Sequence, residues 1–257
     1  MTVSIREQMD LAGKVAVITG ASRGIGAAIA RGLAEFGATV VLSSRRQEGV
    51  DETAAELTGA GFQAAGIAAH VGDPEQLNAL VNTVCDRYGG IDIVVNNAAV
   101  NPMFGPVAGA DLGVLEKILT VNVKGPFELC RLAYPMMQAR GGGAVINVSS
   151  IGGLRPEPML GLYSVSKAAL LSLTKVLAVE WAADGIRVNA ICPGLVQTRF
   201  SAAIWQDEGI LNSVLDRVPL GRLAQPEEIA PLAAFLAGNA AGYITGGVFT
   251  LDGGLTV

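Results

Sequence analysis

The chain has few of the residues that build metal centres or disulfide frameworks. Its 257 residues include three cysteines and one histidine. Cys85, Cys130 and Cys192 are odd in number, lie far apart and form no Cys-x-x-Cys pair. We therefore expect reduced thiols in a cytoplasmic protein. With one histidine and no Cys/His cluster, we expect no metal site.

The chain also lacks a surplus of positive charge. Its net charge is −5, and no run rich in Lys or Arg is present. This balance argues against general nucleic-acid binding and mainly favours solubility. The first seven residues contain no apolar signal core, and the final Gly-Leu-Thr-Val is not a peroxisomal address.

No uninterrupted membrane span is evident in the sequence. Residues 93–110 and 229–251 are uncharged, but Asn, Pro and Gly residues interrupt both stretches. Neither stretch is typical of a continuous spanning helix, and we expect no membrane association.

Short apolar runs instead alternate with helical patterns along the whole chain. The predicted strands begin at Val15 and then cover residues 39–43, 64–69, 92–95, 144–148, 187–191 and 248–251. The predicted helices follow the turn at Gly26 and then cover residues 48–60, 74–88, about 111–138, 162–183 and 226–237. The strands lack polar alternation, which indicates a parallel sheet covered on both faces. We expect a single doubly wound Rossmann domain of class α/β, spanning residues 1–257, with a seven-stranded sheet.

One segment, residues 195–217, breaks this alternation and carries Phe200 and Trp205. It predicts a lid that covers a substrate, although a plain surface excursion is nearly as good an interpretation.

A glycine-rich turn joins the first strand to the first helix. Gly20, Gly24 and Gly26 let the backbone turn sharply and bring bare N–H groups close to a ligand. The helix that starts there offers free N–H groups and a positive dipole end, which suit a phosphate. The spacing is not Gly-x-Gly-x-x-Gly, so the motif alone leaves open a tight connection that binds nothing.

The same turn matches Gly-x-Ser-x-Gly, the nucleophile elbow of serine hydrolases, at Ser22. That enzyme class needs an acid and then a histidine farther along the chain. The only histidine is His70, and the acidic residues before it mostly fall on predicted helices. A serine hydrolase therefore stays a remote alternative.

Tyr163 and Lys167 stand four residues apart in a helical pattern, so their side chains share one face. Tyrosine has a pKa near 10, and a nearby ammonium favours the phenolate and brings the pKa toward neutrality. Such a pair can donate or accept a proton. Ser150 follows an apolar strand and could hold a substrate oxygen beside the phenol, although a surface pair and an ordinary turn serine are also possible.

Together these motifs resemble the classical short-chain dehydrogenase/reductase family over nearly the whole chain. The resemblance lies in residues 19–26, Asn-Asn-Ala-Ala at 96–99, Asn122, Ser150, Tyr163-x-x-x-Lys167 and Pro193-Gly194. Residues 44–47, 70–72, 97–102 and 200–205 look most like the NADPH-dependent carbonyl and retinal reductases of the peroxisomal dehydrogenase/reductase type.

The resemblance implies roles for the catalytic residues. Tyr163 would be the acid/base, Lys167 would lower its pKa and bind the nicotinamide ribose, and Ser150 would position the substrate oxygen. Asn122 would hold a water in a proton relay to Lys167; an ordinary helix asparagine is the alternative.

The resemblance also implies a cofactor-binding set. Its members are Gly20, Ser22, Arg23, Gly24, Ile25, Gly26, Ser44, Arg45, His70, Val71, Asn97, Ala98, Tyr163, Lys167, Pro193, Gly194, Val196 and Thr198. Two positions depart from the family pattern. Ala99 replaces a glycine, and His70 replaces an aspartate, so His70 is also interpreted as a hydrogen-bonded residue at a strand end.

The cofactor is expected to be NADP(H) rather than NAD(H). An acidic residue at the end of the second strand would bind the ribose hydroxyls of NAD, but that position is Ser44, followed by Arg45. Arg23 adds a second guanidinium, and such groups suit a 2′-phosphate. Solvated loop charges are the alternative.

The sequence therefore predicts an oxidoreductase that interconverts ketones or aldehydes and alcohols, and the resemblance implies a homotetramer. A dinucleotide-binding sensor without turnover is the alternative. The residues that would line an apolar substrate pocket are Met103, Phe104, Leu154, Met159, Leu195, Phe200 and Trp205.

Overall fold

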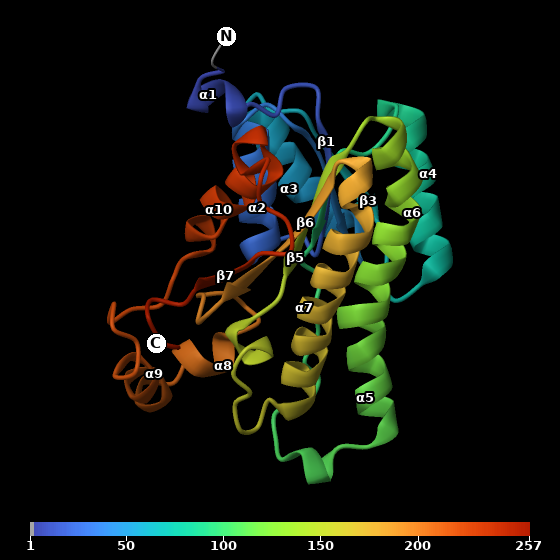
Figure 1. Cartoon of the computed structure of the whole chain (residues 1–257). Coiled ribbons are helices and arrows are strands. Elements are labelled where there is room, and N and C mark those ends of the chain that lie inside the picture. The colour runs from blue at the N-terminus through green and yellow to red at the C-terminus, as the bar shows by residue number, and fades with distance from the viewer. Residues whose placement is uncertain (1–2) are drawn as a thin grey trace.

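The computed structural model describes residues 3–257 and contains a seven-stranded parallel sheet (Figure 1). The strand order is β3-β2-β1-β4-β5-β6-β7, and every neighbouring pair is parallel. The strands are β1 (Val15–Thr19), β2 (Thr39–Ser44), β3 (Ala64–Ala68), β4 (Ile93–Asn96), β5 (Gly143–Val148), β6 (Ile186–Pro193) and β7 (Val248–Leu251). The predicted doubly wound sheet is confirmed.

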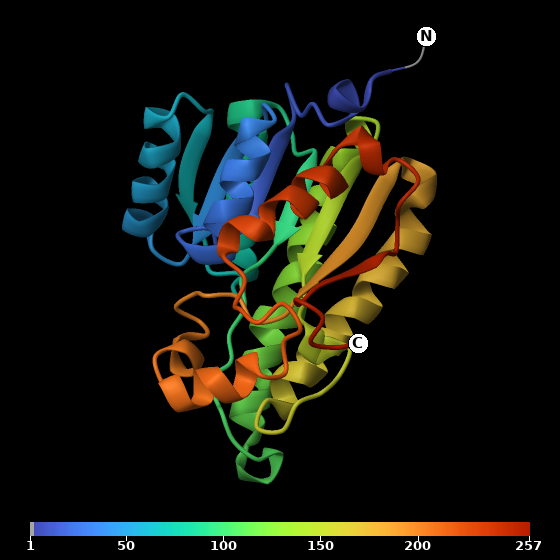
Figure 2. The same ribbon diagram turned by 90° about the vertical axis from the view of Figure 1, so that its left-hand side faces the viewer.

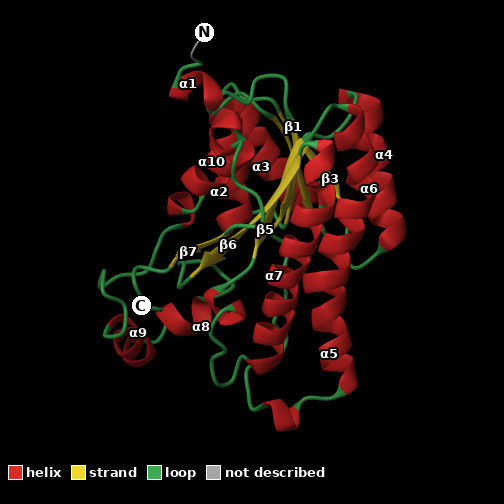
Figure 3. Cartoon of the chain, viewed as in Figure 1, coloured by secondary structure: helices red, strands yellow, loops and turns green. Residues whose placement is uncertain are grey.

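Helices cover both faces of the sheet, which is why the strands show no polar alternation. One face carries α2 (Gly24–Glu35), α3 (Gln47–Gly59) and α10 (Ala230–Ala237). The other carries α4 (Pro74–Tyr88), α6 (Gly125–Ala139) and α7 (Gly161–Trp181). The two layers of helices are visible on either side of the strands in Figures 1 and 3.

Strand β1 shows how the two cores share the sheet. Ala16 and Ile18 belong to the core under α2 and α10, while Val15 and Val17 belong to the core under α4 and α6. Successive side chains of a strand point to opposite faces, so a strand between two helical layers must be apolar throughout.

Two helices differ from the sequence prediction. The helix expected over residues 111–138 consists of α5 (Leu112–Leu119), a π-helical turn (Thr120–Lys124) and α6. The helix expected over 226–237 is a 3₁₀ turn (Pro226–Glu228) and then α10, with Ile229 between them. Gly125 and Pro126 directly follow the first break, and Pro231 follows the second; both prolines lie in the first turn of a helix, where proline is tolerated.

Helix α7 is long and apolar enough to cross a membrane by length and composition, together with the 3₁₀ turn that continues it to Asp184. It is the only helix in residues 3–257 with that property. Its buried side packs on β6 and contributes Leu177 and Ala178 to the core, so the apolar character serves the contact with the sheet.

Residues 195–217 leave the layered pattern, as predicted. They form two short helices, α8 (Ala202–Trp205) and α9 (Glu208–Leu215), which pack against each other. Figure 2 shows these helices, in orange, beyond the carboxyl ends of the strands and near the C-terminus. This is the side of the sheet on which the polar motifs gather.

Candidate active site

The site lies where the strand order reverses, between β1 and β4. Connections from these two neighbouring strands run to opposite faces of the sheet, which opens a crevice at their carboxyl ends. The glycine turn follows β1, and Asn97 and Ala98 follow β4. The two predicted cofactor-binding segments are therefore neighbours in space.

The glycine turn needs its glycines for two reasons. Gly20 and Gly24 have φ values of +64° and +59°, in the left-handed region that favours glycine. A Cβ at Gly26 would lie 2.5 Å from the Asn97 Nδ2 atom and from the Gly20 carbonyl oxygen. Helix α2 begins at Gly24, and the preceding Arg23 makes no side-chain capping bond. The first N–H groups of a 12-residue helix thus face the crevice without a side-chain cap, which fits a phosphate.

Thr19 and Asn97 hold the two segments together. The Thr19 hydroxyl accepts hydrogen bonds from the backbone N–H groups of Asn97 and Ala98, both at 3.1 Å. The Asn97 side-chain amide donates to the carbonyls of Thr19 at 3.0 Å and Gly20 at 3.1 Å. Thr19 belongs to the family motif without a predicted role in the site, and its position directly before the glycine turn is the signal that points to it.

The expected 2′-phosphate region shows exposed cations. Arg23, Arg45 and Arg46 have exposed side chains, and none of them forms an ion pair within the described residues. Strand β2 ends at Ser44, so this position carries a hydroxyl rather than the carboxylate that would bind the ribose hydroxyls of NAD. These free guanidinium groups suit a phosphate better than a ribose hydroxyl.

His70 serves the turn after β3. Its Nδ1 accepts a hydrogen bond of 3.0 Å from the backbone N–H of Gly72, and its own backbone N–H donates to Gln76 Oε1 at 2.9 Å. A Cβ at Gly125 would lie 2.5 Å from the Val71 carbonyl oxygen, so this turn packs tightly on the start of α6. The interpretation of His70 as a hydrogen-bonded residue near a strand end agrees with these contacts. The adenine contact of His70 and Val71 stays a prediction.

The segment after β6 returns to the glycine turn. Strand β6 ends at Pro193, and the Gly194 N–H donates to the Leu251 carbonyl at 2.9 Å. A Cβ on Gly24 would lie 3.4 Å from the Thr198 methyl carbon. Val196, which lies between Gly194 and Thr198 in the sequence, is buried and forms an isolated parallel bridge with Ala224. Residues 193–198 therefore lie against the turn at 20–26.

Ser150 is brought to α7 by a glycine-rich turn. Its Oγ accepts a 3.0 Å bond from the Gly152 N–H at the start of the 3₁₀ turn Ile151–Gly153. A Cβ at Gly153 would lie 2.8 Å from the Lys167 carbonyl carbon, so only glycine allows this close approach. Ser150 and Tyr163 are neighbours as a result, and the Ser150 hydroxyl opposes the rise of the Tyr163 pKa described below.

Tyr163 and Lys167 share one face of α7, as predicted. The Lys167 side chain is buried, and its Nζ donates a 2.8 Å hydrogen bond to the Val148 carbonyl at the end of β5. Burial raises the pKa of Tyr163 to about 12 and lowers the pKa of Lys167 to about 8. Both shifts follow from the cost of burying a charge. Lys167 is not among the causes that shift the Tyr163 pKa here, so a lowering of that pKa by the ammonium stays a prediction.

Asn122 lies in the π-helical turn rather than in a regular helix. Its two amide hydrogens go to the Val100 carbonyl and the Ser166 Oγ, both at 3.0 Å, and its Oδ1 accepts from the Val100 N–H at 2.8 Å. Among the described residues Asn122 and Lys167 share no hydrogen bond. Ser166 also donates to the Tyr163 carbonyl at 2.7 Å. The side chain thus positions α7, and the proton relay through a water stays a prediction.

The segment 195–217 reaches the phenol through Phe200. The Phe200 and Tyr163 ring centroids are 5.8 Å apart with an interplanar angle of 41°, an ordinary tilted aromatic contact. The indole N–H of Trp205 donates to the Thr198 carbonyl at 2.9 Å. The first contact connects the segment 195–217 to Tyr163, and the second holds α8 against the residues that precede it.

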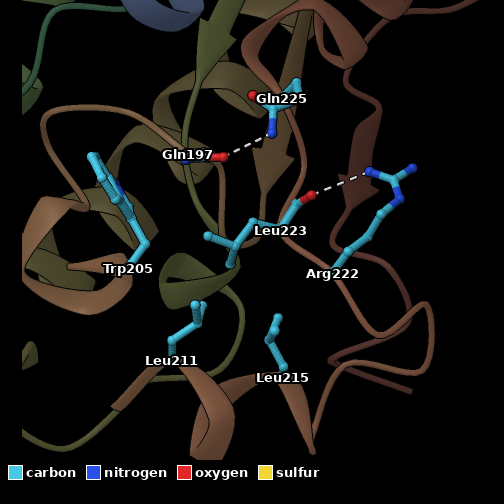
Figure 4. A pocket seen from close by; sticks show the side chains of 7 residues that line it. All are labelled: Gln197, Trp205, Leu211, Leu215, Arg222, Leu223 and Gln225. Carbon is cyan, nitrogen blue, oxygen red and sulfur yellow. Dashed lines mark hydrogen bonds between the residues drawn. The ribbon is translucent and has the colours of Figure 1, made fainter. Parts of the chain in front are cut away.

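A cavity of about 370 Å³ opens between α8, α9 and the loop that follows (Figure 4). Its lining residues are Gln197, Trp205, Leu211, Leu215, Arg222, Leu223 and Gln225. Of the residues expected to form the substrate pocket, only Trp205 lines this cavity. Met103 and Met159 line a second hollow of about 10 Å³.

Comparison with known proteins decides the family. The model of the family described as "Enoyl-(Acyl carrier protein) reductase" matches residues 20–256. "Dehydrogenase/reductase SDR family member 4" from Sus scrofa is 46% identical over 253 residues, covering 98% of this chain and 91% of that protein. The human protein of the same name is 46% identical over 244 residues, covering 95% and 88%. The chain belongs to the short-chain dehydrogenase/reductase (SDR) family.

The predicted resemblance to the classical SDR family, and within it to the dehydrogenase/reductase type, is thereby confirmed. Solved SDR structures share the fold closely. A gluconate 5-dehydrogenase from Burkholderia cenocepacia, in complex with NADP and tartrate, has a TM-score of 0.94 at 33% identity, with 98% of this chain and 99% of that chain covered. A short-chain type dehydrogenase/reductase from Mycobacterium marinum has a TM-score of 0.92 at 35% identity, covering 98% and 99%.

Membership in the SDR family makes this protein an oxidoreductase. The serine hydrolase alternative loses its support, because the chain belongs to another family and the His70 Nδ1 is bonded to Gly72.

Proposed function

We propose that this SDR is an NADP(H)-dependent enzyme that reduces ketones or aldehydes to alcohols, or catalyses the reverse reaction. The observation that carries the proposal is the convergence of Ser150, Tyr163 and Lys167 at the carboxyl edge, beside the glycine turn. A protein that only bound a dinucleotide would have no use for a partly buried phenol next to a serine hydroxyl. The cofactor-binding sensor is therefore the weaker alternative.

The proton transfer is assigned to Tyr163. Its raised pKa keeps the phenol protonated at neutral pH, which is the form that donates a proton to a developing alkoxide. The Ser150 hydroxyl would hold the substrate oxygen next to the phenol. When bound, the nicotinamide ring supplies or accepts the hydride. Asn122 and Ser166 hold the helix turn that carries Tyr163.

The cofactor fits the residues present. The uncapped start of α2 offers N–H groups to the pyrophosphate, and the glycine turn leaves no side chain in the way. Arg23 and Arg45 are exposed and free of acidic partners, which supports NADP(H) over NAD(H). The gluconate 5-dehydrogenase structure holds NADP, which supports a dinucleotide in this fold.

The substrate is proposed to be an apolar carbonyl compound. Phe200 stacks on the ring of Tyr163, and Met103 and Met159 line a hollow with Val107 and Leu162. These side chains offer apolar contacts and few hydrogen-bond partners for a sugar acid. We propose that residues 195–217 act as the lid over this substrate.

We also propose a cytoplasmic homotetramer. The three cysteines are free thiols. Val165, Val176 and Val179 are exposed on one side of α7, where a second subunit could cover them. Light scattering that returned the mass of a monomer would contradict this assembly.

The test is oxidation of NADPH and NADH, followed by loss of absorbance, with aromatic ketones, diketones, retinal, an oxoacyl thioester, an enoyl thioester and 5-ketogluconate. We expect turnover with NADPH on the apolar ketones. Tyr163→Phe should lower kcat by about 100-fold or more while NADPH still binds. Tyr134→Phe is the matched control, because its hydroxyl bonds to Asp184. A wild type that binds NADPH but reduces no compound would support the sensor.

A further inference from the structure

The segment that carries Arg45 and Arg46 is fixed by two residues that the proposed function does not use. They are Gln47, the first residue of α3, and Thr53, one and a half turns later. Both side chains make hydrogen bonds outside their own helix, and the two sets of bonds lead in different directions.

Gln47 attaches the start of α3 to the edge strand β3. Its Nε2 donates to the Gly66 carbonyl at 2.9 Å, and its Oε1 accepts from the Ala68 N–H at 2.8 Å. Directly after β3 the N–H of Ala69 bonds to Ser44 of the neighbouring strand β2, so Gly66 and Ala68 present their backbone groups to the open side. The side-chain amide of Gln47 therefore bonds the backbone groups of the edge strand β3 that a further strand would otherwise bind. The Nε2 also donates to Asp51 Oδ1 at 2.7 Å.

Thr53 attaches α3 to the glycine turn. Its hydroxyl lies 3.1 Å from the Ser22 carbonyl oxygen and 3.1 Å from the Gly49 carbonyl oxygen. A Cβ on Gly49 would lie 3.3 Å from the Ser22 Cβ, so the helix and the turn are in close contact at this point. The hydroxyl hydrogen is shared between the two carbonyls, and the bond to Ser22 is the one that leaves the helix.

Both attachments lie next to the exposed arginines in the sequence. Arg23 directly follows Ser22, and Arg45 and Arg46 directly precede Gln47. Thr53 thus fixes α3 relative to the segment that bears Arg23, while Gln47 fixes the end of the loop that bears Arg45. The separation between the two sources of positive charge depends on both attachments.

We propose that Gln47 and Thr53 are positioning residues for cofactor choice, which hold Arg45 at the distance from Arg23 that a 2′-phosphate requires. The inference rests on the proposed preference for NADP(H). Guanidinium groups bind phosphate through several directed hydrogen bonds, so a loose loop loses phosphate affinity first. NAD(H) carries only a hydroxyl at that carbon, so its binding should change little when the loop loosens.

The chain offers a matched control for each variant. Gln47→Ala is paired with Gln63→Ala, since Gln63 is an exposed glutamine next to β3 whose side chain makes no hydrogen bond in the described structure. Thr53→Val is paired with Thr58→Val, because Thr58 lies on the same helix and bonds only to the carbonyls of Ala54 and Ala55. Thermal unfolding of all four variants checks that each is folded.

Two measurements test the proposal. The first is the ratio of kcat/KM for NADPH to that for NADH. The second, which needs no turnover, is calorimetric binding of 2′,5′-ADP and of 5′-AMP. We expect Gln47→Ala and Thr53→Val each to lower the NADPH/NADH ratio by about 3- to 10-fold, the effect of weakening one hydrogen bond from Arg45 to the 2′-phosphate. The affinity for 2′,5′-ADP should fall by a similar factor while that for 5′-AMP stays within about 2-fold.

The outcomes separate this inference from the proposed function. A wild type that prefers NADH, or binds 5′-AMP as well as 2′,5′-ADP, overturns the NADP(H) preference itself. A wild type that prefers NADPH together with variants that keep its ratio overturns the inference alone. Equal losses for both cofactors would show that Gln47 and Thr53 only support the fold, and the same ratio change in the control variants would also contradict the proposal.

Discussion

The Lys167 ammonium lies 5.6 Å from the centre of the Tyr163 ring while it donates a hydrogen bond to the end of β5. The lysine is thus held by the sheet and faces the phenol ring from the side of the strand ends. Lys167 is buried and Tyr163 is partly buried, and the loss of hydration raises the pKa of the phenol to about 12 and lowers the pKa of the ammonium to about 8. The two groups therefore respond to pH in different ranges.

This arrangement predicts opposite pH profiles for the two reaction directions. Reduction needs the protonated phenol, which dominates far below pH 12, so its kcat/KM should be flat from pH 6 to about 8. Above about pH 8 Lys167 loses its charge, and the rate should fall. Oxidation needs the phenolate, whose share grows about tenfold per pH unit below the pKa. The kcat/KM of oxidation should therefore rise from pH 6 to about 8.

Initial rates from pH 6 to 10 in buffers of constant ionic strength would measure both profiles. A reduction rate that stays constant from pH 7 to 10 would show that the Lys167 charge is not needed. An oxidation rate that falls between pH 6 and 8 would remove the phenolate from the mechanism.

Arg45→Asp is predicted to reverse the cofactor preference. The substitution places a carboxylate directly after β2, where it can accept bonds from ribose hydroxyls and repels a 2′-phosphate. We expect the NADPH/NADH ratio of kcat/KM to fall by about 10-fold or more. Arg87→Asp is the control, since Arg87 is exposed in the last turn of α4. An unchanged ratio in Arg45→Asp would make Arg45 an ordinary solvated charge.

Asp92 supplies a prediction about stability. Its carboxylate is 2% exposed and accepts from Lys14 at 3.2 Å, from the Val15 N–H at 2.9 Å and from Arg140 at 3.0 Å. It joins the amino ends of β1 and β4, opposite the candidate site. Asp92→Ala should lower the free energy of unfolding by about 1–3 kcal/mol, because the Val15 N–H is left buried without an acceptor.

Urea unfolding would measure this loss, and Glu116→Gln is the control. Glu116 forms an exposed pair with Lys124, and because solvent screens such a pair, its removal should change the free energy of unfolding little. Asp92→Ala protein that is still folded should keep its kcat, because the site is at the other end of the strands. A loss of stability no larger than that of Glu116→Gln would refute the structural role of Asp92.

Periodicity and glycine placement were sufficient to predict the fold. Continuous apolar runs such as residues 15–18 can only be buried between two layers, and alternation with helices requires parallel strands. The four-residue spacing of Tyr163 and Lys167 likewise placed both on one helix face. These features depend on local sequence, so the sequence alone was informative.

The remaining features of the site depend on contacts between distant segments. The π-helical turn at Thr120–Lys124 is held by Asn122 bonds to Val100 and Ser166, which no local pattern encodes. The bond from Lys167 to Val148 exists only because β5 ends beside α7. Whether Lys167 lowers the phenol pKa or is outweighed by burial is therefore a property of the packed structure.

The last prediction concerns Trp205, whose indole N–H donates to the Thr198 carbonyl. This bond connects α8 to Thr198, the residue next to the glycine turn, so movement of the segment 195–217 should change the affinity for the cofactor. Trp205→Phe keeps an aromatic ring in the cavity of Figure 4 but removes the donor. We expect the Kd for NADPH to rise by about 2- to 5-fold.

Trp181→Phe is both the control and the reporter. Trp181 stacks on Tyr134 with centroids 4.8 Å apart at the far end of α7, so its replacement should leave the NADPH affinity unchanged. It also leaves Trp205 as the only tryptophan in the chain. Because Thr198, which accepts the Trp205 hydrogen bond, lies against Gly24 of the glycine turn, the Trp205 emission of this variant should change on addition of NADPH. Emission that is insensitive to saturating NADPH, together with an unchanged Kd in Trp205→Phe, would show that residues 195–217 are a surface excursion without a role in cofactor binding.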